Sequence, residues 1–276
     1  MTPESKLYSF LDNKNSFTIH FLEGQKVIEQ MAVLHHLKGA GFSYYRDLLL
    51  SVLPFVSFVK KGESFGLYLD SEEPYFRFKL ETNYTGNFRT LLLPEAFDQF
   101  PQKLTGMVRF SKLFDNSTPY TTIMQVEELD FSQIINQLIR DSYQIEAKAH
   151  LSDIVDQSFF ISKIPRENVG RYIIDPGLTL EQYEKKFCPD LNTIFAENFT
   201  EEKDIVDFFT KRGFYFLGSK PFNYYCPCTR ERMITNLVTL SAEDINELFD
   251  QNNELEITCD YCHEKYKINK LEIIPN

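Results

Sequence analysis

The chain has 276 residues, of which 43% are hydrophobic, a composition typical of a globular protein with about two domains. Its formal net charge of -11 at pH 7 argues against nucleic acid as a partner, because binding to phosphates depends on clustered basic side chains. The longest apolar stretch, residues 48–59, includes Ser51, Pro54 and Ser57 and is too short to cross a membrane. We therefore expect neither nucleic acid nor a membrane as a partner.

Residues 1–167 predict a domain of mixed helices and strands. Helices are expected from apolar spacing at 26–38, 43–60 and 130–139. Gly39 is expected to end the first helix, and Pro54 to bend or break the second. Strands are expected at 16–22, 64–69, 74–80, 87–93, 106–110, 120–126, 144–151 and 158–164. Adjacent strands interrupted by helices indicate an α+β core domain rather than a doubly wound parallel sheet.

Residues 168–225 have a different character and predict a helical, aromatic-rich linker subdomain. Short helices are expected at 178–187, 191–199 and 201–212. Pro189 and Thr200 separate these helices, and Gly213 ends the last one. Aromatic residues recur throughout, at Phe187, Phe195, Phe199, Phe208, Phe209, Phe214, Tyr215, Phe216, Phe222, Tyr224 and Tyr225. Because short helices bury little surface alone, we expect the linker to pack on its neighbours.

Residues 226–276 predict a small third domain. A helix is expected at 230–238, and Ser241 with Asp244 predicts the capping box of a second helix that runs to Asp250. Strands at 254–258 and 265–268 are expected to form a hairpin. The start of the first helix and the hairpin then each carry one pair of cysteines.

Four of the five cysteines form two close pairs, Cys226-Pro-Cys228 and Cys259-Asp-Tyr-Cys262. Each pair can supply two corners of a tetrahedron, and such sets hold Zn²⁺ as a closed structural site. The alternative is two structural disulfides, which suit a secreted protein. Asp12 and Lys14 interrupt the N-terminal segment, so no signal peptide is recognisable and a reducing cytoplasm is expected. This favours one zinc ion on Cys226, Cys228, Cys259 and Cys262.

The fifth cysteine, Cys188, precedes Pro189 in the linker. We interpret it as a small buried residue, with a fifth redox thiol as the alternative. No nucleophile elbow, zinc-protease motif, phosphate loop or dinucleotide fingerprint is present in the sequence. We therefore expect no enzymatic activity.

Two segments carry a family resemblance: Tyr225-Cys-Pro-Cys-Thr-Arg-Glu-Arg232 and Ile257-Thr-Cys-Asp-Tyr-Cys-His-Glu-Lys-Tyr266. Both closely resemble the zinc-binding tail of the heat shock protein 33 family, the thirty-three-kilodalton chaperonins. The approach to the first pair, from Phe214 to Tyr224, also resembles the family. The likeness extends upstream in order through nearly the whole chain, but only the tail matches at the level of a motif, so the chain resembles a divergent member.

The resemblance implies a redox-regulated, ATP-independent holdase chaperone that is inactive when reduced and zinc-bound. Oxidation is then expected to form the disulfides Cys226–Cys228 and Cys259–Cys262 and to release zinc. The tail and linker unfold, and apolar surface binds unfolding client proteins. Active members of the family are homodimers, so a homodimer is expected in the oxidised state.

Two other functions remain open. The tail can be a constitutive zinc-stabilised adaptor for a protein partner, without any redox switching. A thiol oxidoreductase is a weaker alternative, because the thioredoxin-like βαβ setting of a CxxC motif is absent.

Energetics support a tail that depends on its metal. A domain as small as residues 226–276 has a marginal hydrophobic core. Structural zinc contributes about 10–16 kcal/mol of apparent folding free energy in comparable peptides, whereas whole domains have a net stability of about 5–15 kcal/mol. Loss of zinc is therefore expected to unfold the tail. If the linker packs against the tail, its aromatic side chains then become exposed and can bind other apolar chains.

Overall fold

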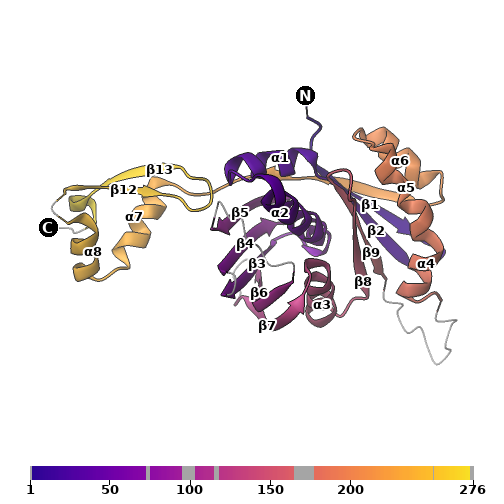
Figure 1. The fold of residues 1–276 in the computed structure, drawn as a ribbon, viewed down its shortest axis with the longest axis horizontal. Helices are drawn as coiled ribbons and strands as arrows, with labels where there is room; N and C mark the ends of the chain where they lie inside the picture. Colours follow the sequence, from indigo (N-terminus) through magenta and orange to yellow (C-terminus); the bar gives the residue numbers. More distant parts are fainter. Residues whose placement is uncertain are drawn as a thin grey trace. The chain divides into compact units, whose positions relative to one another are not determined.

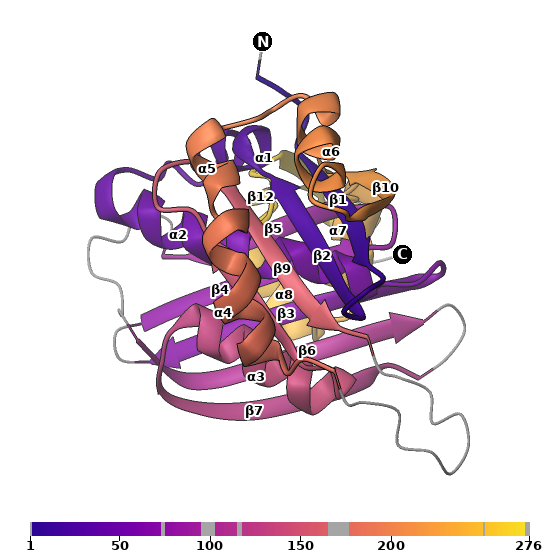
Figure 2. The same cartoon turned by 90° about the vertical axis from the view of Figure 1, so that its right-hand side faces the viewer.

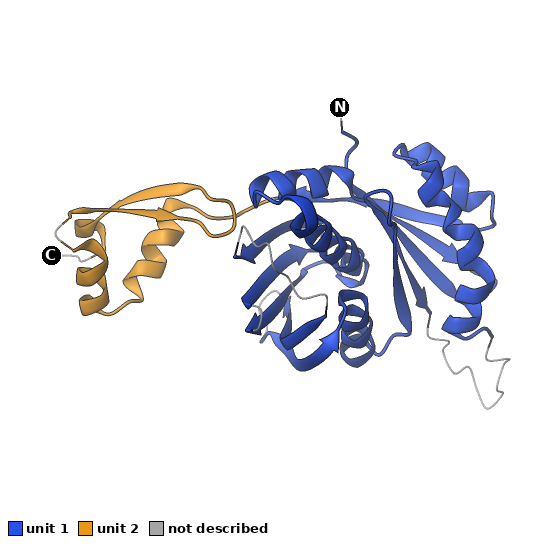
Figure 3. Cartoon of the chain, in the orientation of Figure 1, with its two compact units in different colours: residues 1–224 blue, residues 225–276 orange. Residues whose placement is uncertain are grey.

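The computed structural model describes residues 2–72, 75–94, 103–114, 118–164, 177–250 and 252–273. The chain divides into two compact units, Met1–Tyr224 and Tyr225–Asn276 (Figure 3). Among the described residues, no helix combines the length and apolar character needed to cross a membrane. The division into core, linker and tail expected from the sequence stays a prediction.

The first unit contains a five-stranded antiparallel sheet with the strand order β10-β1-β2-β9-β8. Its strands are β1 Lys6–Asp12, β2 Phe17–Glu23, β8 Ala147–Leu151, β9 Gln157–Lys163 and β10 Tyr215–Pro221. The central strands are buried on both faces, so successive residues of β9 are nearly all buried. This sheet joins the start of the chain to the end of the predicted linker, because β10 pairs with β1.

A second, six-stranded sheet has the order β11-β5-β4-β3-β6-β7. Its strands are β3 Glu63–Glu72, β4 Tyr75–Asn83, β5 Asn87–Leu93, β6 Leu104–Phe114, β7 Tyr120–Leu129 and β11 Asn223–Tyr224. The only parallel pairing described is that of the short β11 with β5. The chain therefore leaves the first sheet at β10 and joins the second sheet at β11, immediately before the first cysteine pair.

Helices fill the space between the two sheets. These are α1 Gln25–Leu34, α2 Gly39–Val52, the 3-10 helix η1 Leu53–Phe58 and α3 Phe131–Tyr143. Their apolar side chains form one core with side chains from both sheets, including Leu22 and Phe160 from the five-stranded sheet and Leu67 and Phe78 from the six-stranded sheet. Asp130 caps α3 and completes a capping box with Gln133, as a helix that begins at this aspartate requires.

The opposite face of the five-stranded sheet is covered by three helices, α4 Leu180–Leu191, α5 Thr193–Glu197 and α6 Glu202–Thr210 (Figure 2). Their side chains share a second core with β1, β2 and β9. Phe10 stacks on Phe209 with 4.1 Å between ring centroids, and Phe159 stacks on Phe195 at 5.4 Å. The short helices of residues 177–213 are therefore stabilised by burial against the sheet.

Two positional predictions were wrong. Gly39 begins α2 instead of ending α1. Helix α1 ends earlier, at Leu34, and His36 beyond it has a left-handed φ of 54°. Buried His35 lies between them, with its Nε2 2.9 Å from Oγ1 of Thr90. Pro189 lies inside α4 instead of separating two helices. The proline lies in the last turn and removes the helical hydrogen bond to the carbonyl of Lys185. Asn192 closes that turn by donating its backbone N–H to the carbonyl of Cys188.

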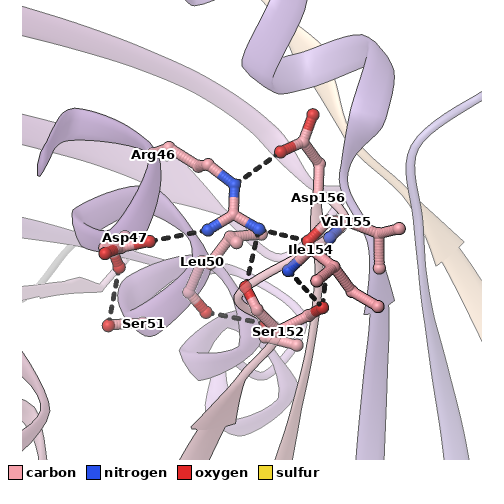
Figure 4. A network of polar contacts seen from close by, with 9 residues as sticks. Arg46, Asp47, Leu50, Ser51, Ser152, Ile154, Val155 and Asp156 are labelled. Atoms are coloured by element: carbon pink, nitrogen blue, oxygen red, sulfur yellow. Dashed lines mark hydrogen bonds and ion pairs between the residues drawn. The ribbon is translucent and has the colours of Figure 1, made fainter. Parts of the chain in front are cut away.

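A partly buried arginine, Arg46, links the two halves of the first unit (Figure 4). Arg46 of α2 donates from Nε to Asp156 at 2.6 Å and from Nη2 to the carbonyl oxygen of Ser152 at 2.7 Å. It also contacts Asp47 and the carbonyl of Val155. These bonds attach the helix layer to the turn between β8 and β9 of the five-stranded sheet.

The second unit is a hairpin packed on two helices (Figure 1). It comprises α7 Arg230–Val238, α8 Ala242–Phe249, β12 Glu254–Thr258, β13 Lys265–Asn269 and the short 3-10 helix η2 Lys270–Glu272. Among the residues of this unit that the structure describes, the buried apolar core is formed by Leu237, Ile245, Phe249, Ile268 and Ile273. So small an apolar core gives little stability by itself.

Candidate functional site

The two cysteine pairs are held by different elements of the second unit. Cys226 and Cys228 precede α7, whose cap residue Thr229 accepts a hydrogen bond from the backbone N–H of Arg232. Cys259 and Cys262 lie in the turn between β12 and β13. Cys259 donates its N–H to the carbonyl of Glu264, which tightens that turn. Each pair is therefore fixed by local hydrogen bonds of its own.

All four sulfur atoms converge. Their Sγ atoms lie within 4.8 Å of one another, with 3.8 Å between Cys226 and Cys259 and 3.2 Å between Cys228 and Cys262. Both short contacts join one pair to the other. Cys259 is buried, and the other three thiols are partly buried. The structure thus places the four cysteines that the sequence singled out in one cluster.

The donor set and spacing fit a zinc ion. Four sulfurs at about 2.3 Å from a tetrahedral ion lie about 3.8 Å from each other. The Cys226–Cys259 contact already has this length, and the Cys228–Cys262 contact needs to open by about half an ångström. A cluster of four thiols also matches the preference of zinc for thiolate ligands.

Tyr266 of β13 is a direct partner of the cluster that sequence reasoning did not assign a role. Its hydroxyl lies 3.1 Å from Sγ of Cys228 and 3.3 Å from the Cys228 carbonyl oxygen. Burial by itself raises the pKa of Cys228, but the Tyr266 hydroxyl and the neighbouring thiols outweigh it and lower that pKa. Burial raises the pKa of Cys262. This contact depends on the pairing of β12 with β13, which places Tyr266 beside the cysteine cluster.

The basic residues near the cysteines in sequence have other partners. Arg230 pairs with Glu272 at 2.6 Å, and Arg232 donates to the carbonyl of Pro227 at 2.8 Å. The two hairpin lysines pair across the strands, Lys265 with Glu256 and Lys267 with Glu254. These contacts stabilise the hairpin and the start of α7, and none of them joins a basic group to a cysteine sulfur.

The aromatic residues of the linker divide into buried and exposed groups. The buried group is Phe195, Phe208, Phe209, Phe214 and Phe222. Tyr215, Phe216 and Tyr225 are exposed, and so is Leu217, which follows Phe216 in β10. Five of the eleven aromatic residues in the series are therefore buried in this state, and Phe187 and Phe199 pack partly against the core over the five-stranded sheet.

Comparisons with known proteins agree on one family. Residues 5–269 match the family model described as Hsp33 protein. A 33 kDa chaperonin of Clostridium perfringens (strain SM101 / Type A) is 27% identical over 162 residues, which cover 56% of this chain and 50% of that protein. The match therefore spans about half the length of that relative. A 33 kDa chaperonin of Aquifex aeolicus (strain VF5) is 19% identical over 279 residues, covering 93% of this chain and 84% of the relative.

A solved structure has the same fold. The crystal structure of the 33 kDa chaperonin (heat shock protein 33 homolog) from Thermotoga maritima superimposes with a TM-score of 0.73 at 15% sequence identity. The superposition covers 98% of this chain and 96% of that chain. It confirms the α+β architecture expected from the sequence.

Proposed function

The chain belongs to the Hsp33 family, and on that premise we propose that it is a redox-regulated, ATP-independent holdase chaperone. Its relatives are named chaperonins, which are not enzymes. The observation that carries the proposal is the convergence of four thiols in a unit whose apolar core is very small. Such a unit can be switched by the oxidation state of its cysteines.

In the reduced state, Cys226, Cys228, Cys259 and Cys262 would hold one zinc ion as thiolates. When bound, zinc supplies a cross-link between the start of α7 and the β12–β13 turn. The Tyr266 hydroxyl orients Cys228 within the set and satisfies one of its lone pairs. Zinc would thereby keep α7 and the β12–β13 hairpin together.

Oxidation by hydrogen peroxide would form the bonds Cys226–Cys228 and Cys259–Cys262. Each bond forms from two thiolates that lose two electrons, while one peroxide takes these electrons and two protons to give two waters. The present short sulfur contacts join opposite pairs. A disulfide within each pair would replace these contacts between the pairs. The link between α7 and the hairpin is then lost.

The segment immediately before Cys226 can pass this change to the first unit. Residues 215–224, which we call the strap, include β10 at the edge of one sheet and the two-residue β11 at the edge of the other. Edge strands have few partners and open at low free energy. Release of the strap uncovers β1 and the buried aromatic cluster around Phe209. Exposed apolar surface and an unpaired strand edge both bind unfolding chains.

The wider setting of this activity follows from the same reasoning. We propose that the clients are unfolding proteins and that the oxidised form is a homodimer. The net charge of -11 keeps the opened form dissolved. A reducing cytoplasm suits a site that must be thiolate at rest.

One observation favours the adaptor alternative. The second unit exposes several apolar side chains while it is folded, among them Val238 at 55%, Leu248 at 48% and Leu271 at 74% of their full surface. Such residues can contact a protein partner without any unfolding. In that case zinc would remain bound under oxidant.

Light scattering of a heat-unfolding client protein tests the function. We expect the reduced, zinc-loaded chain to leave aggregation unchanged and the peroxide-treated chain to suppress it. Cys188→Ser keeps the four clustered cysteines, so its suppression of aggregation should still depend on peroxide treatment. Failure to suppress aggregation in both states would contradict the holdase proposal, and zinc retained through the peroxide treatment would favour the adaptor.

A further inference from the structure

A second cluster of metal-binding side chains lies far from the four cysteines in sequence, within the first unit. His150 is on β8, whereas Glu184 and Cys188 are one turn apart on α4. Residues four apart share one face of a helix, and this face is turned toward β8. The imidazole, carboxylate and thiol ligand atoms all lie within 4.8 Å of one another.

The contacts are short and largely shielded from solvent. Nε2 of His150 lies 2.8 Å from Oε1 of Glu184 and 3.7 Å from Sγ of Cys188. The side chains of His150 and Glu184 are 19% and 14% exposed, and Cys188 is buried. Phe159 stacks on the imidazole with 4.9 Å between ring centroids, which fixes the plane of the ring.

The arrangement does not suit nucleophilic catalysis. In a Cys-His-carboxylate triad the carboxylate holds one ring nitrogen while the thiol uses the other. Here the carboxylate and the thiol approach the same nitrogen, Nε2. Burial and the nearby Glu184 also raise the pKa of Cys188 to about 12, so the thiol is not a reactive thiolate. Convergence on one point is instead what a shared ion requires.

We propose that His150, Glu184 and Cys188 form a second site for a zinc-like divalent cation, with water in the fourth position. In a tetrahedral zinc site a sulfur and an imidazole nitrogen lie about 3.6 Å apart, and a nitrogen and a carboxylate oxygen about 3.4 Å. The first distance is present already. The second requires Glu184 to withdraw by about half an ångström, within the freedom of its side chain.

Charge balance sets the conditions for binding. Lys148 pairs with Glu184 at 3.0 Å and must turn away, which its 48% exposed side chain allows. Cys188 loses its proton to solvent on binding, and the two anionic ligands then neutralise the dication. Burial lowers the pKa of His150, so the imidazole is neutral and ready to bind. Because one proton is released, the apparent affinity should rise about tenfold per pH unit near neutrality.

This site would attach α4 to β8. α4 belongs to the helical layer over the five-stranded sheet, so the ion would hold that layer in place. The inference is independent of the holdase proposal, because none of its ligands is in the four-cysteine cluster.

Metal stoichiometry of the full-length reduced chain tests the site. After equilibrium dialysis against buffered Zn²⁺ at pH 7.5, we expect about two ions per parent chain and about one in Glu184→Gln and in Cys188→Ser. The matched control is Glu181→Gln, an exposed glutamate one turn earlier on α4, which should keep about two. Unchanged far-UV circular dichroism would show that each variant folds.

Cobalt spectra and hydrogen exchange identify which site is lost. With Co²⁺, Glu184→Gln should lose a weaker thiolate-to-cobalt absorption and keep the stronger one of the four-cysteine set. Zn²⁺ should slow amide exchange in 180–191 of the parent chain by at least tenfold, and this protection should be absent in Glu184→Gln. Equal stoichiometry in the parent chain and all three variants, with no zinc-dependent protection of α4, would overturn the proposal. Loss of an ion only when the four clustered cysteines are replaced would do the same.

Discussion

Glu23 is a buried carboxyl group whose ionisation opposes folding. It is 1% exposed at the end of β2, and burial, with added repulsion from Asp156 and Glu29, raises its pKa to about 7. Because the pKa of Glu23 is higher in the folded state than in the unfolded state, its protonated form stabilises the fold. This contribution is complete below pH 4.5, the pKa of the unfolded state, and is lost as the pH rises through the pKa of the folded state. The first unit should therefore weaken between pH 5 and pH 8.

Glu23→Gln should remove most of this pH dependence. The amide keeps the oxygen that accepts the backbone N–H of Gln25 but cannot ionise. From pH 5 to pH 8 the free energy of unfolding of the variant should rise relative to the parent chain by roughly 2–3 kcal/mol. Urea unfolding of the first unit at both pH values measures this, with Glu197→Gln, at an exposed glutamate of α5, as control. A constant difference across pH would show that Glu23 is not titrating in this range.

Tyr266 is the residue at the four-cysteine cluster whose role is most easily isolated. Its hydroxyl contacts Cys228 Sγ at 3.1 Å, and a hydrogen bond to a thiolate ligand makes the sulfur less nucleophilic. Tyr266→Phe should release zinc under peroxide several-fold faster, measured with a chromogenic chelator. Tyr225→Phe, at a tyrosine that is 58% exposed, should release zinc at the parental rate. Equal rates in all three proteins would mean that the hydroxyl does not protect the sulfur.

At the scale of elements, local patterns located most helices and strands. The ranges 87–93, 230–238 and 254–258 were expected from the sequence and are present as β5, α7 and β12. β1 and β10 were missed. β1 has apolar residues on both faces, so its sequence does not alternate. β10 is exposed and contains Gly218 and Pro221, and it becomes a strand only because β1 pairs with it across some two hundred residues of chain.

The strap depends on a close approach at Gly86. A Cβ placed on Gly86 would lie 2.0 Å from the carbonyl oxygen of Pro221, and the residue has a φ of +84°. Gly86→Ala must therefore displace the strap, and the first unit should lose on the order of 2–4 kcal/mol of stability. Limited proteolysis within 215–224 should become faster.

Gly213 provides the matched control for this prediction. It has a similar φ of +87°, but no atom lies within 4 Å of its added Cβ. Gly213→Ala should cost about 1 kcal/mol from backbone strain alone, with strap proteolysis close to the parental rate. Equal effects of the two substitutions on the strap would show that the contact with Pro221 is not what holds it.

At the scale of the whole molecule, the two units differ in what stabilises them. The first unit has two extensive apolar cores, whereas the second has five buried apolar residues and the cysteine cluster. Removal of zinc should therefore unfold the second unit and leave the first largely folded. The expected stability loss of about 10 kcal/mol exceeds what so small a core provides.

Chelation of the reduced chain, followed by hydrogen exchange, measures this difference. Amides of 226–273 should lose protection on addition of a strong zinc chelator, while those of the central strands β2 and β9 should keep theirs. Readdition of zinc should restore protection. A second unit that stays protected without metal would show that its apolar core is sufficient, and would remove the physical basis of the switch.

The sequence alone determined the two cysteine pairs of the tail, the family and the α+β class. These follow from short-range patterns: cysteines two and three residues apart, helix caps beside them, and alternation within single strands. Tertiary structure decided which distant residues meet. The strap on β1, the burial of Glu23, the hydroxyl of Tyr266 on Cys228 and the meeting of His150 with Glu184 and Cys188 all join residues that no local pattern connects. They arise because strand pairing and packing within each unit bring together segments that are far apart along the chain.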